Sequence, residues 1–528
     1  MTGRQLNADS ELDRRGNSLP AIAFSVFTVL AMQVQFQNAQ IYSLATPESL
    51  VLSTGLVCVG MAAGLVLHRS GRVLGAVIVG LLVSVFFNHV LDWEALGVRM
   101  RVSIPLLFAA GFAFSWLTQR KAPLILGAGA AAILISALLI PGPGPSSQKQ
   151  DGTLQAGEKA TGPALIHLIL DEHLGIEGFP LQVPGAAETK ALIRDFYIGH
   201  GFRVYGRAIS RHTMTHNSIP ETLNLGGVVN DFDLVDIDAT KGYVVKKSRV
   251  FRRLSEIGYR FRIYQTDAVD YCGLNGVSKC VTFRYRTLNW LADTALGWGD
   301  RFYVLVSAFL NRATLWRKFE GIYRDVRQAA SVRGIPLPKL RTNPKGYAPL
   351  TMIPLFERLT RDVAELNRGT VLFSHLMLPH GPHALDEDCQ LRRPAPQWYG
   401  VSAKEEYRLY FRQLSCTYRL LERLFQAIDE NPRLADATVI VHSDHGSRID
   451  IDGLPGENQW VSSYSILFAV RRPGVEPGYV EGINNLTALF ADQLAPLGVS
   501  APKLPAPRSI MRRTAVKGRL AVERMPNF

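Results

Sequence analysis

The sequence lacks the features that mark most nucleic-acid-binding and redox proteins. It carries a formal net charge of +13, but it contains no run rich in Lys and Arg and no aromatic–basic module that would support a nucleic-acid partner. Its five cysteines include no Cys-x-x-Cys pair, which argues against a zinc ribbon or a thioredoxin-type site. A domain held beside anionic lipid headgroups explains the basic charge better.

Charged residues are also scarce at the start of the chain. Only nine Lys or Arg and six Asp or Glu occur up to Pro141. Five apolar stretches fill this part, each about long enough to cross a bilayer as a helix: residues 19–36, 48–67, 72–90, 102–118 and 123–140. The sequence therefore predicts a transmembrane domain over residues 1–141. A cleaved signal peptide is the alternative for the first stretch, but four more stretches follow it.

The short loops between these stretches predict their orientation. Seven basic residues lie on one side, namely Arg4, Arg14, Arg15, Arg69, Arg72, Arg120 and Lys121. The other loops carry only Arg99 and Arg101, offset by Asp92 and Glu94. Because basic loops stay in the cytoplasm, we expect a cytoplasmic N-terminus and an extracytoplasmic domain after the fifth stretch. In a Gram-negative cell this is a multi-pass inner-membrane protein with a periplasmic domain.

The remainder of the chain has a different pattern. Residues 142–163 lack apolar periodicity, which is typical of a linker. Over residues 164–528, short apolar runs alternate with longer amphipathic stretches, which predicts an α/β domain with helices on both faces of a sheet. Strands are expected at residues 164–170, 203–209, 259–265, 370–378, 437–443 and 465–470.

Polar clusters follow four of these strands. Asp-Glu-His at 171–173 follows the first strand and a Ser, Thr and His-rich segment at 210–220 follows the second. His-Gly-Pro-His at 380–383 and Asp-His-Gly at 444–446 follow two later strands. Because the carboxyl ends of strands in open α/β sheets collect ligand and catalytic groups, we expect these clusters to converge.

The four clusters together resemble the alkaline phosphatase/sulfatase superfamily, and more closely the membrane-bound phosphoethanolamine and phosphoglycerol transferases. The resemblance covers roughly residues 160–500. It is carried by LILDEH at 168–173, THNSIP at 215–220, HLMLPHGPH at 375–383 and SDHG at 443–446. The S-D-H-G segment is specific only in combination with the acidic end of the first strand.

The resemblance implies a role for each cluster. Glu172 takes the metal-ligand position of the transferases, and Asp171 is a second candidate because sulfatases use two adjacent acids. Asp444 and His445 match the ligands of the S-D-H-G segment. Thr215 matches the nucleophilic threonine of the T-x-x-S-x-P pattern and would also ligate the metal.

The same resemblance implies that His380 contacts the substrate phosphate or a second metal. Ser218 and His383 are further candidates for substrate binding, while Ser218 and Thr213 are the alternative nucleophiles. Thr222 stands where a formylglycine sulfatase needs Arg, which argues against that class. No histidine follows S-D-H-G, so that a second metal site is either incomplete or completed by another residue.

The residue types favour a divalent metal on physical grounds. A threonine hydroxyl is a poor nucleophile at neutral pH unless a metal lowers its pKa. Two carboxylates, an imidazole and an alkoxide suit Zn²⁺, whereas Mn²⁺ or Mg²⁺ would favour more oxygen ligands. We therefore expect zinc, with Mn²⁺ or Mg²⁺ as the alternatives.

These features predict an inner-membrane transferase. It would move a phosphoethanolamine or phosphoglycerol headgroup from a phospholipid donor to a periplasmic glycan or glycolipid acceptor, through a phospho-threonine. A membrane-anchored phosphodiesterase or sulfatase-like hydrolase, with water as the acceptor, is the first alternative. A catalytically silent scaffold is the second, and the complete set of acid, Thr and Asp-His residues counts against it.

Two further features lie outside the clusters. An oxidising compartment predicts the disulfides Cys272–Cys280 and Cys389–Cys416, with free buried thiols as the alternative. Residues 283–320 mix aromatic and basic side chains. This mixture favours helices lying on the outer membrane–water interface, with an ordinary packed helix pair as the alternative.

Overall fold

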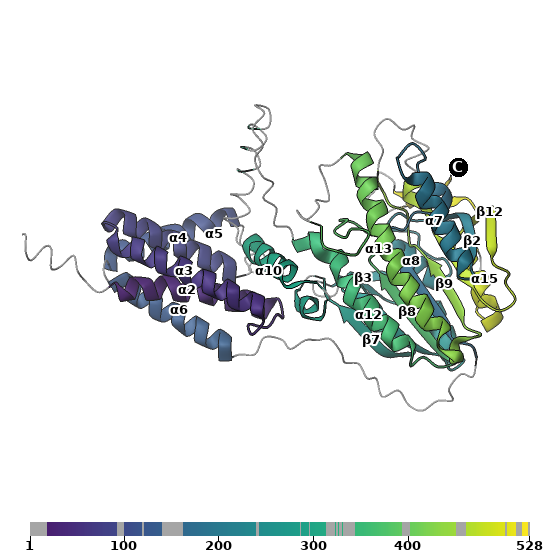
Figure 1. Cartoon of the computed structure of the whole chain (residues 1–528), viewed down its shortest axis with the longest axis horizontal. Helices are drawn as coiled ribbons and strands as arrows, with labels where there is room; N and C mark the ends of the chain where they lie inside the picture. The colour runs from purple at the N-terminus through teal and green to yellow at the C-terminus, as the bar shows by residue number, and fades with distance from the viewer. Residues whose placement is uncertain are drawn as a thin grey trace, which may run out of the picture. The chain divides into compact units, whose positions relative to one another are not determined.

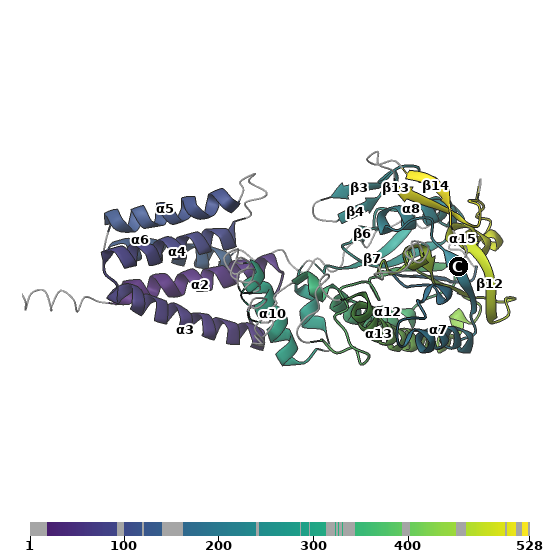
Figure 2. The same cartoon turned by 90° about the horizontal axis from the view of Figure 1, so that it is seen from above.

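The chain forms two compact units (Figures 1 and 2). The computed structural model describes residues 18–91, 100–118, 121–139, 162–238, 242–285, 287–294, 296–312, 344–392, 402–449, 461–501, 504–513 and 520–525, with isolated positions between 313 and 343. One unit consists of Met1–Pro145, Thr287–Ala292 and Leu296–Pro344, and the other of Ser146–Arg286, Asp293–Ala295 and Lys345–Phe528. Most of the predicted linker, residues 142–161, lies outside the described residues.

The first unit is a bundle of apolar helices. Its members are α2 (Leu19–Ala39), α3 (Pro47–Arg69), α4 (Arg72–Val90), α5 (Met100–Thr118) and α6 (Ala122–Leu139). Within the described residues, four of these helices are long and apolar enough to cross a membrane, and the apolar part of α5, Val102–Thr118, is shorter. At 1.5 Å per residue, the whole of α5 is about 28 Å long, close to the thickness of the hydrocarbon core.

Small residues bring these helices into close contact. A Cβ atom at Gly64 of α3 would lie 2.4 Å from the Cα atom of Ile22 in α2, and one at Gly60 would lie 2.8 Å from the Cα atom of Val26. Glycine is therefore required at both positions for α3 to approach α2. Such close approach between small residues is a common way for membrane helices to associate.

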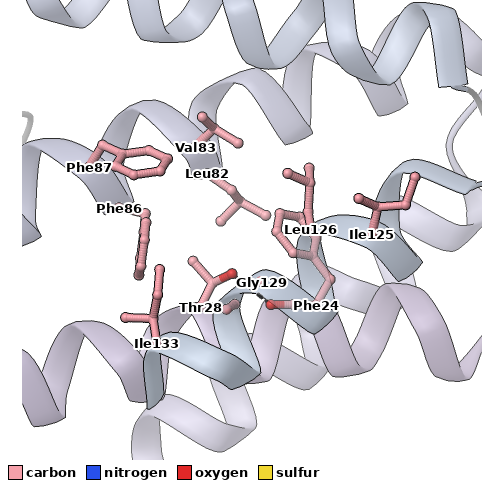
Figure 3. Close-up of a pocket in the computed structure, with 11 residues that line it drawn as sticks. Phe24, Thr28, Leu82, Val83, Phe86, Phe87, Ile125, Leu126, Gly129 and Ile133 are labelled. Atoms are coloured by element: carbon pink, nitrogen blue, oxygen red, sulfur yellow. Dashed lines mark hydrogen bonds between the residues drawn. The ribbon is translucent and has the colours of Figure 1, made fainter. Parts of the chain in front are cut away.

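The bundle also encloses an apolar cavity of about 130 Å³ between α2, α4 and α6 (Figure 3). Side chains such as Phe24, Phe86 and Ile133 line it. Its one hydroxyl, that of Thr28, donates a hydrogen bond to the carbonyl oxygen of Phe24 at 2.7 Å. The cavity therefore offers no group for polar chemistry.

A later amphipathic helix, α10 (Trp298–Arg312), belongs to the same unit and packs against α3. The guanidinium Nε of Arg301 lies 3.6 Å from the carboxylate of Glu48, which is buried. The ring of Phe309 packs edge-on against Phe36, with the ring centres 5.4 Å apart. Residues 313–320 of the predicted interfacial segment lie outside the described residues, and its position at a membrane surface stays a prediction.

The second unit is built on a mixed sheet. In spatial order its strands are β10-β2-β11-β9-β1-β8-β5-β7, and β12 pairs with β2. Their bounds are β1 (Leu165–Leu170), β2 (Arg203–Ile209), β5 (Arg260–Thr266), β7 (Val277–Phe283), β8 (Thr370–Leu376), β9 (Thr438–His442), β10 (Ser465–Ile466), β11 (Phe468–Arg471) and β12 (Gly478–Asn485). All six predicted strands are present, the last divided into β10 and β11. The strands β9, β1, β8 and β5 are parallel neighbours.

Helices cover both faces of this sheet (Figure 2). One face carries α7 (Ala186–Gly199), α12 (Met352–Val363) and α13 (Ala403–Asp429), and the other carries α8 (Thr215–Asn224) and α15 (Leu486–Leu494). Helix α9 (Arg249–Glu256) packs against α8. An apolar core joins the second face to the sheet. Two smaller sheets are separate from the main sheet, namely β3 (Val235–Asp238) with β4 (Gly242–Val245) and β6 (Val269–Asp270), and β13 (Ser509–Arg513) with β14 (Leu520–Arg524). The predicted α/β class is confirmed.

Both predicted disulfides are present in this unit. Cys272 is bonded to Cys280 beside β7, and Cys389 is bonded to Cys416 of α13. The second bond ties the segment that follows β8 to a long helix. Cys58, in α3, is free and exposed.

Candidate metal and catalytic site

Three predicted ligands meet at the carboxyl ends of two neighbouring parallel strands. Asp171 follows β1, and Asp444 and His445 follow β9, which pairs with β1. One ligand atom from each lies within 4.8 Å of the others, and all three residues are buried. The strand order itself therefore brings together residues 273 positions apart, as the sequence pattern predicts.

The two carboxylates each keep one oxygen without a hydrogen-bond partner among the described residues. The Oδ1 atom of Asp444 accepts the backbone N–H groups of His445 at 2.9 Å and Glu172 at 3.3 Å, but its Oδ2 atom has no such partner. The Oδ2 atom of Asp171 lies 3.2 Å from Nε2 of His375, and its Oδ1 atom is unpartnered. Unsatisfied buried oxygens are costly, so this arrangement fits a bound cation.

His445 completes the donor set. Its Nδ1 atom lies 2.9 Å from the carbonyl oxygen of Gly446, so that Nδ1 carries the proton and Nε2 presents its lone pair. Nε2 lies 3.3 Å from Oδ2 of Asp444, 3.7 Å from Oδ1 of Asp171 and 3.3 Å from the hydroxyl of Thr215. Two carboxylate oxygens, an imidazole nitrogen and a hydroxyl therefore converge, which are suitable ligands for a divalent metal such as zinc.

The electrostatics agree with this interpretation. Burial and the negative charge of Asp171 raise the pKa of Asp444, because two nearby carboxylates disfavour double ionisation. Burial would also raise the pKa of Asp171, but the charges of His380, His375 and His445 outweigh it and lower that pKa. A divalent cation would relieve the repulsion between the two carboxylates.

Thr215 is the first residue of α8. Apolar side chains of this helix belong to the core that packs against the sheet. The hydroxyl of Thr215 therefore lies at a helix N-terminus, where the helix dipole favours negative charge. The hydroxyl of Ser218, one turn later, is buried and bonds to the carbonyl oxygen of Asp444 at 2.5 Å. This bond holds α8 against the end of β9, and a role of Ser218 in substrate binding stays a prediction.

Glu172 points to a different set of partners from Asp171. Its Oε1 atom pairs with the guanidinium of Arg448, with Nε at 2.9 Å, and lies 3.6 Å from Nε2 of His380. Its Oε2 atom accepts the backbone N–H of Gly381 at 3.2 Å. Burial would raise the pKa of Glu172, but the charges of His380 and Arg448 lower it. Metal ligation by Glu172 stays a prediction.

The two histidines of the third cluster have different environments. Burial would lower the pKa of His380, but the carboxylates of Glu172 and Asp171 raise it. Burial lowers the pKa of His383 to about 4, so that this ring is neutral near pH 7. His383 packs against the ring of Tyr410, and its Nδ1 atom lies 3.5 Å from the side-chain amide of Gln413. Contact of His383 with a substrate stays a prediction.

Sequence reasoning missed three residues of this site. His375, near the end of β8, faces Asp171. The sequence feature that could have identified it is a polar residue at an inward-facing position of an apolar strand. Arg448 occupies the segment after S-D-H-G, where the family pattern is broken. Tyr410 of α13 donates to the carbonyl oxygen of Glu172 at 3.1 Å and accepts the N–H of Leu174, and no sequence pattern marked it.

Comparison with known proteins supports the predicted resemblance to sulfatases. Residues 319–499 match the family model described as Sulfatase, a region that includes Asp444 and His445. No curated protein matches the chain significantly. Similar solved structures include the C-terminal periplasmic domain of EcEptC from Escherichia coli in complex with Zn, with 12% identity and a TM-score of 0.38 over 71% of this chain and 94% of that one.

Two further structures are similar at the same level. The phosphonate monoester hydrolase of Agrobacterium radiobacter has 13% identity and a TM-score of 0.39 over 68% of this chain and 82% of that one. An alkaline phosphatase superfamily protein from Vibrio parahaemolyticus has 12% identity and a TM-score of 0.37 over 70% and 79%. The predicted resemblance to the sulfatase family is confirmed by the match of residues 319–499 to that family model.

Proposed function

We propose that this protein is a metal-dependent inner-membrane transferase. It moves a phosphoethanolamine or phosphoglycerol headgroup from a phospholipid to a periplasmic glycan or glycolipid. The observation that carries the proposal is the convergence of Thr215 with Asp171, Asp444 and His445, in a chain that also carries a packed bundle of apolar helices. One helix would anchor the domain, and a bundle suits an enzyme whose donor is itself a lipid.

The residues of the site have separate roles in the first step, as metal ligands and as the nucleophile. Asp171, Asp444 and His445 would hold zinc, with Mn²⁺ or Mg²⁺ as the alternatives. The metal would lower the pKa of the Thr215 hydroxyl and stabilise charge on the phosphoryl oxygens. Thr215 Oγ1 then forms a bond to phosphorus, and the bond between phosphorus and the glycerol oxygen of diacylglycerol breaks. The headgroup phosphate remains on Thr215.

His380 is the proposed proton donor in this step. The neighbouring carboxylates raise its pKa, so that it can donate a proton to the leaving glycerol oxygen. In the second step it would accept the proton of the acceptor hydroxyl, which attacks phosphorus and releases Thr215. The products are a headgroup-modified glycan and diacylglycerol.

The experiment is incubation of the purified full-length protein with labelled phosphatidylethanolamine or phosphatidylglycerol. We expect diacylglycerol release and a headgroup adduct on Thr215, detected by peptide mass spectrometry. Thr215→Ala should abolish both while keeping the bound metal and the melting temperature. Thr213→Ala is the matched control and should retain both products.

Two outcomes would change the proposal. Diacylglycerol release that persists in Thr215→Ala would assign the nucleophile to Thr213 or Ser218. Free headgroup phosphate that forms at the same rate with and without a glycan acceptor would favour the membrane-anchored phosphodiesterase. A wild-type protein that binds metal but releases nothing from either lipid would contradict headgroup transfer.

A further inference from the structure

The carboxylate of Glu172 contacts cationic and backbone donors. Its Oε1 atom receives the Nε and a terminal nitrogen of Arg448 and lies near His380, while Oε2 accepts the N–H of Gly381. The side chain of Glu172 is buried. Oε1 is therefore committed to Arg448, whereas Oε2 accepts one N–H and keeps a lone pair. The geometry of Oε1 fits the fixing of a guanidinium group.

The backbone around Arg448 is also held in a defined shape. Arg448 has a φ angle of 55°, a left-handed conformation that is unfavourable for a residue with a side chain and often marks functional sites. Two backbone bonds fix the turn, from Gly446 N–H to Ser463 and from Arg448 N–H to Ser462. A Cβ atom at Gly446 would lie 2.0 Å from the carbonyl oxygen of Ser462, so glycine is required there.

The guanidinium of Arg448 keeps donors for a further partner. Besides Glu172, its acceptor among the described residues is the sulfur of Met214, 3.4 Å from Nη1, and a thioether is a weak acceptor. Met214 directly precedes Thr215. The side chain of Arg448 is 30% exposed, whereas that of Glu172 is 7% exposed. One edge of the guanidinium is therefore anchored on Glu172, and the side chain keeps some exposure next to the residue that precedes Thr215.

A second Arg–Glu–His group in the same domain is more deeply buried. Glu221 of α8 binds Arg211 through one oxygen and His212 through the other, at 2.5 Å. The side chain of Arg211 is 13% exposed and that of His212 is 3% exposed, whereas that of Arg448 is 30% exposed. The two groups share residue types and differ in how much of the arginine reaches solvent.

We propose that Arg448 binds the non-bridging oxygens of the substrate phosphate, and that Glu172 positions Arg448 rather than ligating the metal. The inference deepens the proposed function and rests on it for the identity of the phosphate ester. A planar guanidinium suits this task because it can donate two parallel hydrogen bonds to a phosphate.

The test measures binding of inorganic phosphate to the full-length metal-loaded protein by calorimetry, together with metal content by elemental analysis. Arg448→Met should weaken phosphate binding at least about tenfold, as expected for loss of charge-assisted hydrogen bonds. The phosphate affinity of Arg448→Lys should lie between those of Arg448→Met and the wild type, because an ammonium group cannot donate two parallel hydrogen bonds. Glu172→Gln should weaken phosphate binding as well and keep its metal.

The matched control is Arg368→Met. Arg368 forms an ion pair with Asp436 at the opposite edge of the same sheet, where β8 and β9 begin, and its loss should leave phosphate affinity unchanged. Melting curves establish that each variant is folded. Wild-type phosphate affinity in Arg448→Met, or loss of metal from a folded Glu172→Gln, would overturn the inference. Neither measurement uses a lipid donor, so failure of headgroup transfer would leave this test intact.

Discussion

The helical bundle and the sheet domain both bury polar side chains, but they satisfy them in different ways. In the bundle most buried polar groups are neutral and several bond within or between neighbouring helices, although the Oε1 atom of Gln33 and the Oε2 atom of Glu48 have no hydrogen-bond partner among the described residues. The amide of Gln33 donates to Gln37 at 2.9 Å, and the hydroxyl of Ser103 donates to Asn88 at 3.0 Å. In the sheet domain, Asp171 and Asp444 are ionisable and each keeps an oxygen without a partner among the described residues.

An unpartnered oxygen therefore does not by itself mark a ligand site, and the distinguishing feature of the sheet domain is that two buried carboxylates and an imidazole face one another. A satisfied neutral pair inside a bundle contributes modestly to stability and leaves nothing free for chemistry. Two facing carboxylates weaken the metal-free fold, because each raises the free energy of ionising the other. A protein that keeps such a pair has a site whose stability depends on what binds there.

The largest expected effect tests this contrast directly. Asp444→Asn should remove the bound metal and lower turnover by about a thousandfold or more. In the metal-free protein the same change should raise the melting temperature, because it removes one of two repelling charges. Elemental analysis, turnover and calorimetric melting measure the three quantities. Metal retained at wild-type levels would contradict the assignment of the site.

Two control variants sharpen the Asp444→Asn test. Asp362 is a carboxylate with complete partners, since it accepts from Tyr264, Lys279 and Arg358. Asp362→Asn should therefore lower the free energy of unfolding by roughly 2 kcal/mol, and with it the melting temperature. The variant should keep the metal. Asn88→Ala in the bundle should keep metal and turnover and cost only about 0.6 kcal/mol. If Asp444→Asn lowers the melting temperature of the metal-free protein, this result would contradict the repulsion between the two carboxylates.

A smaller effect is expected from the pH dependence of His380. Its pKa is raised because the charges of Glu172 and Asp171 outweigh burial, so that the protonated form persists above the ordinary value of about 6.5. Stability from this charge is present below that value and is lost as pH rises through the folded-state pKa. Turnover should fall over the same range.

His380→Gln should lower turnover about a hundredfold and remove this alkaline decrease. The control is His442, which is buried without a carboxylate partner and whose pKa is lowered to about 4. Changing it should alter stability and not the pH profile above neutrality. An alkaline decrease that survives in His380→Gln would assign the proton to another group.

The last effect leaves turnover aside and concerns the stability contributed by the covalent cross-links that only the sheet domain carries. Removing the Cys389–Cys416 bond by a double change to Ser should cost about 3 kcal/mol, since the bond closes a loop with a sequence separation of 27. Cys58→Ser, in the bundle, should leave the melting temperature unchanged because Cys58 is free and exposed. Equal melting of all three proteins would show that the bond contributes nothing to stability.

Much of this architecture was readable from the sequence because it depends on local patterns. Apolar stretches of nearly bilayer length predict spanning helices, and β-rich runs that end in polar clusters predict strands with a site at one edge. The S-D-H-G segment and the acidic strand end then identify Asp444, His445 and the pair Asp171 and Glu172. Each of these features is set within a few neighbouring residues.

The tertiary structure decided what neighbouring residues alone cannot. The family resemblance ranks Glu172 ahead of its neighbour Asp171 as a metal ligand, but a left-handed φ of 62° at Glu172 turns the chain where the two side chains separate. Asp171 thereby faces Asp444 and His445, and Glu172 faces Arg448, 276 residues away. The membership of α10 in the bundle is decided likewise, by contacts such as Arg301 with Glu48. Such pairings depend on the packing of distant segments, which no local pattern records.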